Sequence, residues 1–289
     1  MSLALVLAIT VIQVTGPDHM RAYRAVKGLQ AGNHVFVASP VGRTLEEARI
    51  VFASAAKRPG RIAVGDLGPV TSADETVLAK AKTLGKLKRV TAHFRGGLPH
   101  LGEARPGGAE PGEGAWRAWL GVMPLRPFRS HYVKDEGWRA YLDFGTGPLG
   151  KDGARVLRPV FRALQLVAPL YAERIAVDCE APDRETYPRK ARIRVVFRND
   201  FDLILVWGEG REGLVWEGAE GTLESQASDG VPLAEQVKAL EAGAAIPPEA
   251  EPLTETILLG CRAAMTPKRV TASDCEKRYV RDGWEWEGL

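Results

Sequence analysis

Cysteine is scarce in this chain of 289 residues, which contains only Cys179, Cys261 and Cys275. Three cysteines cannot build a disulfide framework, and none of the pairs has the spacing of a zinc clip. We therefore expect a protein of the reducing cytoplasm. Long apolar runs are missing too: residues 2–14 are too few to span a bilayer and lack the basic flank of a signal peptide. They predict a buried strand, and we expect no membrane contact.

Two phosphate-binding motifs are also missing. No GxGxxG follows the first predicted strand, which argues against a dinucleotide cofactor, and no GxxxxGK[ST] indicates a P-loop. All five histidines lie within the first 131 residues. A Ser-His-Asp hydrolase built from the second half of the chain is therefore not expected.

The net charge of +3 conceals an uneven distribution. Residues 1–110 carry 15 basic and 8 acidic side chains, residues 111–200 carry 16 and 11, and residues 201–289 carry 8 and 17. Basic segments favour polyanionic partners such as nucleic acids or phosphate ligands. The alternative is two solvated faces of opposite sign.

Strand and helix patterns alternate over the first hundred residues. The second helix begins with a capping box in which Thr44 is followed three residues later by Glu47. Such alternation predicts an α/β protein with an N-terminal, doubly wound, Rossmann-like parallel sheet. The predicted strands are 2–14, 34–38, 61–64 and 89–94, and the predicted helices are 19–30, 44–56 and 71–84.

The carboxyl ends of parallel strands share one edge, where ligands of such sheets bind. Small residues at these ends let backbone N–H groups approach a phosphate, although each glycine taken alone is also explained by turn chemistry. The strand ends are Thr15-Gly16, Ser39-Pro40-Val41-Gly42, Asp66-Leu67-Gly68 and Arg95-Gly96-Gly97.

A stretch rich in Gly, Pro and Glu predicts a linker at residues 102–114. It separates an expected ligand-sensing domain, 1–101, from a second α+β module, 115–289. Aromatic and arginine side chains alternate over residues 115–145, which fits either a nucleic-acid stacking surface or a core with charged edges. A helix is predicted at 154–172, and strands at 174–177, 191–197, 202–207 and 214–217.

Carboxylates gather near the ends of these later strands. Asp202 and Glu217 are expected on the two strands of one hairpin, with Asp178 shortly before them. Clustered carboxylates can hold Mg²⁺ or Mn²⁺ and activate water for phosphodiester cleavage. The region resembles the core of PD-(D/E)xK nucleases, which implies a catalytic role for Asp202 and Glu217. Ala219 replaces the lysine of that motif, and the alternative is charged hairpin ends.

The order of parts resembles a CRISPR-associated Rossmann-fold (CARF) sensor joined to a nuclease-like module. The resemblance rests on the strand from His34 to Pro40 and on the strand that ends in Arg95-Gly96-Gly97. It implies a homodimer that binds a cyclic oligoadenylate across its two-fold axis and cuts nucleic acid with a divalent metal, or only binds it. The residues it places around the ligand are Thr15, Gly16, Ser39, Arg95, Gly96, Gly97 and His100.

Two other functions remain open at this point. One is a non-enzymatic assembly protein that binds nucleic acid through its basic first 200 residues and a neighbour through its acidic tail. It would bind nucleic acid with a steep dependence on salt. The other is an α/β enzyme that acts on a small phosphorylated metabolite, for which the sequence shows no catalytic motif. If the chain is not a nuclease, we expect no cofactor.

Overall fold

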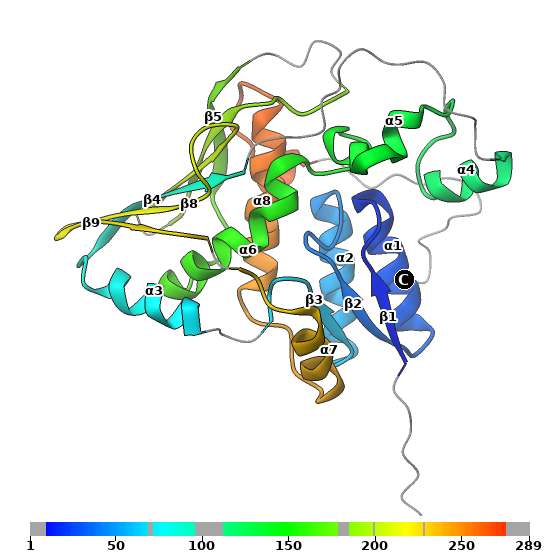
Figure 1. Cartoon of the computed structure of the whole chain (residues 1–289), viewed down its shortest axis with the longest axis horizontal. Helices are drawn as coiled ribbons and strands as arrows, with labels where there is room; N and C mark the ends of the chain where they lie inside the picture. Colours follow the sequence, from blue (N-terminus) through cyan, green and yellow to red (C-terminus); the bar gives the residue numbers. More distant parts are fainter. Residues whose placement is uncertain are drawn as a thin grey trace, which may run out of the picture.

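The computed structural model describes residues 10–68, 72–95, 112–178, 185–198, 200–227 and 229–275. These residues form an α/β protein with a parallel Rossmann-like sheet at the N-terminus and a larger mixed sheet after it (Figure 1). The predicted fold class is confirmed. No helix in the described part of the chain is both long and apolar enough to cross a membrane.

The first sheet has the strand order β1-β2-β3, and both pairs are parallel. Buried valines such as Val35, Val37 and Val64 fill these short strands, as a sheet covered on both faces requires. The predicted capping box forms, because the Thr44 hydroxyl accepts a hydrogen bond from the Glu47 N–H. The elements are β1 (Val11–Val14), α1 (Asp18–Gln30), β2 (His34–Val37), α2 (Leu45–Ala56), β3 (Ile62–Val64) and α3 (Ser72–Lys82).

The strand expected to be fourth in this sheet, β4 (Leu87–Phe94), lies instead in the middle of the second sheet. It pairs in parallel with β7 (Asp202–Trp207) and antiparallel with β8 (Gly213–Gly218). The placement of β4 in the first sheet, and the pairing of β7 with β8 as a hairpin, were therefore wrong predictions. An apolar pattern identifies a strand but not the partner that the chain gives it.

The second sheet has the order β5-β6-β7-β4-β8-β9. Its inner face is apolar, and it buries the large side chains of Phe94, Trp207 and Trp216. Residues 102–111 of the expected linker lie outside the described residues, and Glu113 already belongs to the next helix. The remaining strands are β5 (Tyr171–Val177), β6 (Ala191–Val196) and β9 (Gly221–Ser225).

Two long helices lie between the sheets, α6 (Gly147–Leu164) and α8 (Ala250–Ala264) (Figure 1). Helix α8 contacts α2 on one side and β5 and β6 on the other, while α6 contacts α8 and β4. Helix α6 ends at Leu164, earlier than predicted, because the next residue, Gln165, has a left-handed backbone (φ 46°). Through their contacts, α6 and α8 hold the second sheet against the N-terminal part of the fold, which contains the first sheet.

The segment at residues 113–144, which stands between β4 and β5 in the chain, is compact and aromatic. Trp116, Tyr132, Trp138 and Phe144 are buried, so the aromatic stretch forms a core and not an exposed stacking surface. The short elements here and near the end of the chain are α4 (Glu113–Leu120), α5 (Ser130–Val133), η1 (Lys134–Ala140), α7 (Leu233–Glu241) and η2 (Ala272–Asp274).

Candidate functional site

The carboxyl ends of β1, β2 and β3 open into a cavity of about 250 Å³. Thr15 follows β1 and Ser39 lies just beyond β2, so two of the residues expected around a ligand do line one cavity. Parallel strands explain this convergence, because their carboxyl ends meet at one edge. The other lining residues are Arg21, Phe36, Ala38, Gly65, Asp66, Arg139, Lys151 and Gln236.

The structure does not bring the remaining expected ligand residues to this cavity. Arg95 follows β4 and lines a separate, open cleft at one end of the second sheet, beside His93 and Arg155. Gly16 lies next to the cavity in the loop after β1, and its carbonyl accepts a hydrogen bond from Arg21. Gly96, Gly97 and His100 lie outside the described residues.

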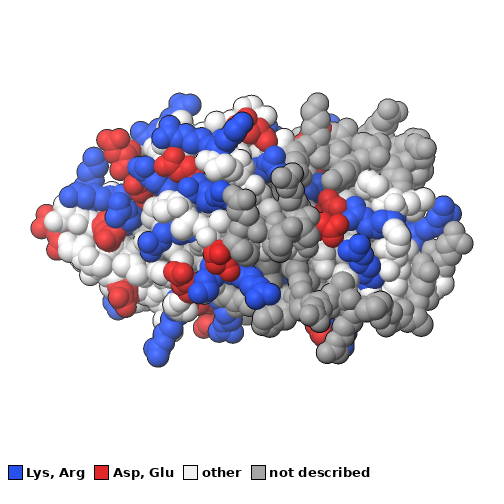
Figure 2. Space-filling model, turned by 90° about the horizontal axis from the view of Figure 1, so that it is seen from above, with Lys and Arg blue, Asp and Glu red and all other residues white. Residues whose placement is uncertain are grey.

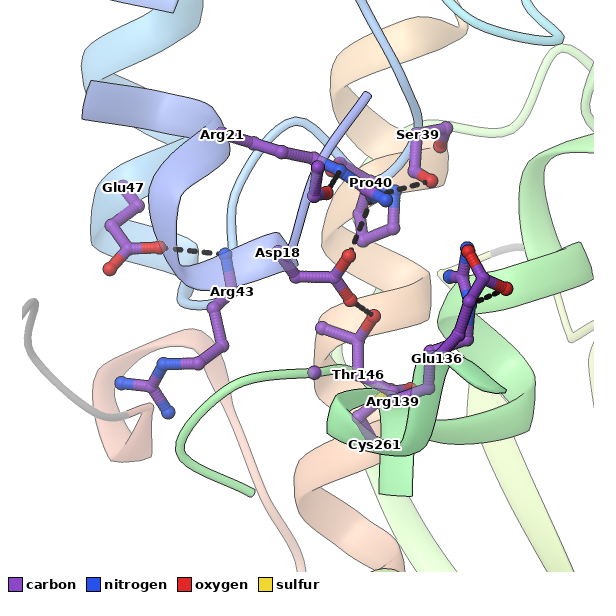
Figure 3. A network of polar contacts seen from close by, with 12 residues as sticks. Asp18, Arg21, Ser39, Pro40, Arg43, Glu47, Glu136, Arg139, Thr146 and Cys261 are labelled. Atoms are coloured by element: carbon purple, nitrogen blue, oxygen red, sulfur yellow. Dashed lines mark hydrogen bonds and ion pairs between the residues drawn. The ribbon is translucent and has the colours of Figure 1, made fainter. Parts of the chain in front are cut away.

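The first residue of α1, Asp18, is buried and holds the centre of a polar network (Figure 3). Its carboxylate accepts a hydrogen bond from the hydroxyl of Thr146, the residue just before α6. The same carboxylate lies 2.8 Å from the guanidinium of Arg21. A carboxylate at this place is favoured by the partial positive charge at the N-terminus of α1.

Arg21 joins the loops that follow the first two strands (Figure 3). Its guanidinium donates hydrogen bonds to the carbonyls of Gly16 at 3.0 Å, Ser39 at 2.9 Å and Pro40 at 3.2 Å. Only 2% of Arg21 is exposed, so its charge is balanced inside the protein by Asp18. This pair fixes the shape of the cavity wall.

His19, the second residue of α1, connects the N-terminus of that helix to the aromatic segment. Its backbone N–H donates to the carbonyl of Phe144 at 3.2 Å, and its Nε2 lies 3.1 Å from the carbonyl oxygen of Trp119. Complete burial lowers the pKa of His19 to about 3, so the imidazole is neutral at physiological pH. The N-terminus of α1 is thus covered by the aromatic segment and does not face solvent.

Asp66 brings a carboxyl group to the cavity. It follows β3 with a left-handed backbone (φ 62°), which is uncommon for a residue with a side chain and is concentrated at functional sites. Burial raises the pKa of Asp66, while the nearby Arg158 and Arg155 oppose that shift. Arg158 also donates to the backbone carbonyl of Asp66 at 2.7 Å, which holds the turn in place.

Two cations from later in the chain complete the cavity. Arg139 forms two hydrogen bonds to the carboxylate of Glu136, at 2.9 and 3.0 Å. Lys151 projects from the exposed side of α6 and forms no hydrogen bond or ion pair with any described residue. Their role could not be found in the sequence, because only tertiary packing brings α6 and η1 to the edge of the first sheet. Asp66 could be found from the sequence, because it lies at the end of a predicted strand.

The carboxylates expected to hold a metal do not form a metal site. Arg89 of β4 lies between Asp202 of β7 and Glu217 of β8, at 3.9 and 3.5 Å from their carboxylates. Arg194 pairs with Asp202 at 2.9 Å. Asp178 accepts a hydrogen bond from the Lys190 backbone instead. Within the described ranges no cluster of three or more His, Cys, Asp or Glu residues could bind a metal ion.

Side chains of both charge signs lie together on one face of the folded chain. On the face in Figure 2, Lys and Arg residues are interspersed with Asp and Glu over the described area. Cross-strand pairs such as Arg194 with Glu173 contribute to this mixing. On this face a nucleic acid would meet acidic as well as basic side chains.

Comparison with known proteins identifies the relatives of this fold. Residues 105–257 match the sequence model of the Gfo/Idh/MocA group, described as "Oxidoreductase family, C-terminal alpha/beta domain". No curated protein matches the chain significantly.

Solved structures of oxidoreductases share the fold. GenD2 from gentamicin A biosynthesis, in complex with NAD, is 16% identical over 90% of this chain and 78% of its own, with a TM-score of 0.60. The WlbA dehydrogenase from Bordetella pertussis, with NADH and UDP-GlcNAcA, is 11% identical over 93% and 80%, also at 0.60. The myo-inositol 2-dehydrogenase from Lactobacillus plantarum is 11% identical over 92% and 81%, at 0.58.

These findings correct the function inferred from the sequence. The relatives are oxidoreductases, so the assignment to CARF sensors, CRISPR defence and nucleases is wrong, and so is the alternative of a nucleic-acid assembly protein. The expectation of Mg²⁺ or Mn²⁺, or otherwise no cofactor, is contradicted by relatives solved with NAD or NADH. Nucleic acid and a homodimer find no support in the comparisons. Because the family match spans more than half of the sequence, this chain belongs to the Gfo/Idh/MocA oxidoreductase family.

Proposed function

We propose that this chain binds a small phosphate ester in the cavity at the carboxyl edge of β1–β3. The proposal rests on two polar groups of the cavity lining that make no hydrogen bond within the described structure. The Ser39 hydroxyl oxygen is buried without a hydrogen-bond partner in the described structure, and Lys151 forms no hydrogen bond or salt bridge within it, although its charge helps to lower the pKa of Glu136. A hydroxyl and an ammonium are both suited to a phosphate oxygen. That relatives are solved with NAD, NADH or a UDP-sugar supports a ligand that contains phosphate.

The whole dinucleotide of those relatives does not fit the residues present here. In Rossmann folds the pyrophosphate lies on the N-terminus of the first helix, and the dinucleotide crosses the point where the strand order reverses. Here the carboxylate of Asp18 occupies that helix end, and the His19 N–H is bonded to Phe144. The described strands of the first sheet run β1-β2-β3 without a reversal. We therefore derive no hydride-transfer step for this chain.

The size and lining of the cavity favour a smaller ligand. Its volume of about 250 Å³ lies just below the range of about 300–1,000 Å³ typical of drug-sized ligands. Lys151 and Arg139 would face the phosphate, and the hydroxyls of Thr15 and Ser39 would donate to it. The carboxyl group of Asp66 would pair with a hydroxyl of the ligand. This pattern favours the phosphate ester of a hydroxylated molecule, such as a sugar phosphate or a mononucleotide.

Isothermal titration calorimetry tests the proposal with glucose 6-phosphate, AMP, unphosphorylated glucose and NADH as probes. We expect at least one phosphate ester to bind at one site per chain and glucose not to bind. Loss of a charged hydrogen bond changes the binding free energy by about 1.5–3 kcal/mol, so Lys151→Met should weaken binding about 10-fold or more. The matched variant Lys80→Met, on the exposed side of α3, should bind normally.

Two results would overturn the proposal. One is that neither phosphate ester binds at millimolar concentration. The other is that NADH binds more tightly than both esters and Lys151→Met leaves its affinity unchanged.

A further inference from the structure

A second, larger cavity of about 840 Å³ lies beside β3, the last strand of the first sheet. Its walls come from β3 and the loop after it, the C-terminal turn of α6, helix α7 and the loop at 244–249, with one side chain each from α3 and α8. Most of the lining side chains are apolar. They include Ile62, Leu78, Phe161, Ala239, Leu240 and Ala244.

The charged groups at this cavity are already neutralised. Arg162 pairs with Glu249 at 2.6 Å and with Asp74 at 3.2 Å, and it donates to the Gly68 carbonyl at 2.6 Å. A charged ligand would therefore find no free counter-ion on Arg162 or Glu249. Apolar walls without a free charge favour a neutral molecule.

One polar group in the lining is not satisfied. Gln236 of α7 is 4% exposed, and its Nε2 donates to the Val231 carbonyl at 2.7 Å. Its Oε1 is buried and accepts no hydrogen bond from the described residues. Buried carbonyl oxygens of this kind normally have a partner. The missing donor is what a ligand can supply.

We propose that this cavity binds a neutral, mainly apolar small molecule that donates one hydrogen bond to Oε1 of Gln236. Its volume lies within the range of about 300–1,000 Å³ found for drug-sized ligands. The site is separate from the phosphate-ester cavity, although Gln236 lines both. The apolar cavity contains none of the cations Arg139 and Lys151 on which the other proposal depends.

Fluorescence titration with N-phenyl-1-naphthylamine tests this site in the full chain. The probe is neutral and apolar, carries one N–H donor, and brightens when it leaves water. We expect saturable binding of one molecule per chain. Ala239→Trp fills the cavity and should abolish the signal, whereas Ala234→Trp, at an exposed position of the same helix, should not. Circular dichroism checks folding, and Ala244→Trp, on the exposed rim, is a second filling variant.

The role of Gln236 needs a matched pair of probes. Gln236→Leu should weaken binding of N-phenyl-1-naphthylamine about 3- to 10-fold, the effect of one neutral hydrogen bond. It should leave binding of 1-phenoxynaphthalene, which lacks the N–H, nearly unchanged. Binding that persists in both filling variants, or no saturable binding to the parent chain, would overturn the proposal. If Gln236→Leu weakened the binding of both probes equally, the proposed hydrogen bond between the ligand and Gln236 would be wrong.

Discussion

The carboxylate of Asp18, the first residue of α1, accepts a hydrogen bond from the hydroxyl of Thr146, the residue immediately before α6. The two residues are 128 positions apart, yet their contact brings the N-termini of two helices together. Each helix end favours negative charge. One internal carboxylate therefore serves both helices, and it also balances the buried Arg21.

Replacing Asp18 by Asn should destabilise the chain strongly. The variant leaves the Arg21 guanidinium buried without its counter-ion, and breaking a buried pair this way costs about 3–5 kcal/mol. Thr146→Val removes only the hydroxyl donor and should cost about 1–3 kcal/mol. Urea unfolding measures both. Glu136→Gln, in the exposed pair with Arg139, is the control and should change stability by less than about 1 kcal/mol. An equally mild effect of Asp18→Asn would contradict the role given to the pair.

Local signals in the sequence predicted much of the fold. The capping box of Thr44 and Glu47 forms as expected, because it depends on residues three positions apart. The position of β4 was not predictable in the same way. Its alternating burial suits either sheet, and only pairing with β7 and β8, more than 100 residues later in the chain, decides where it lies.

In the candidate site, too, features set by local sequence were predicted, whereas features set by contacts between distant segments were not. Thr15 and Ser39 were predicted to lie together, because parallel strands carry their ends to one edge. Lys151 and Arg139 were missed, because they reach that edge through α6 and the segment before it. The carboxylates Asp202 and Glu217 were misjudged, since Arg89 lies between them in the register of the sheet.

His19 should make stability depend on pH. Its pKa is about 3 in the folded state and 6.5 when unperturbed, so between these values the unfolded chain binds more protons. The free energy of unfolding therefore contains the full contribution of His19 above about pH 6.5 and loses it as the pH drops toward 3. The linkage predicts a loss of about 2 kcal/mol between pH 7 and pH 5 from this residue.

Urea unfolding of His19→Gln at both pH values measures that contribution. Glutamine does not titrate but keeps an N–H donor for the Trp119 carbonyl, so the difference between pH 7 and pH 5 should shrink by about 2 kcal/mol. His34→Gln is the control, because His34 is only slightly buried and should contribute much less. An unchanged pH dependence in His19→Gln would show that the imidazole is not buried and neutral.

Divalent metals should not stabilise this protein through Asp202 and Glu217. Asp202 and Glu217 are balanced by Arg89 and Arg194, so an added cation gains little at this position. The melting temperature should stay the same with millimolar MgCl₂, MnCl₂ or EDTA. A rise in melting temperature with either metal that disappears in Asp202→Asn would reinstate a metal site at these carboxylates.

Asp74 of α3 joins two arginines of α6 inside the protein. Its carboxylate lies 3.1 Å from Arg158 and 3.2 Å from Arg162, and its side chain is completely buried. Asp74→Asn would leave both guanidinium groups with less compensating charge, so we expect a loss of about 3–5 kcal/mol in urea unfolding. The neighbouring Glu75 is exposed, and Glu75→Gln should stay within about 0.5 kcal/mol of the parent chain.

Asp74 should also affect the candidate site. Arg158 holds the turn at Asp66 through its backbone carbonyl, and Asp74 holds Arg158. If the phosphate-ester cavity is as we propose, Asp74→Asn should weaken ligand binding even under conditions where the variant remains folded. Calorimetry on the folded variant measures this effect. Unchanged affinity would mean that Asp74 stabilises the packing of α3 on α6 without positioning the turn at Asp66.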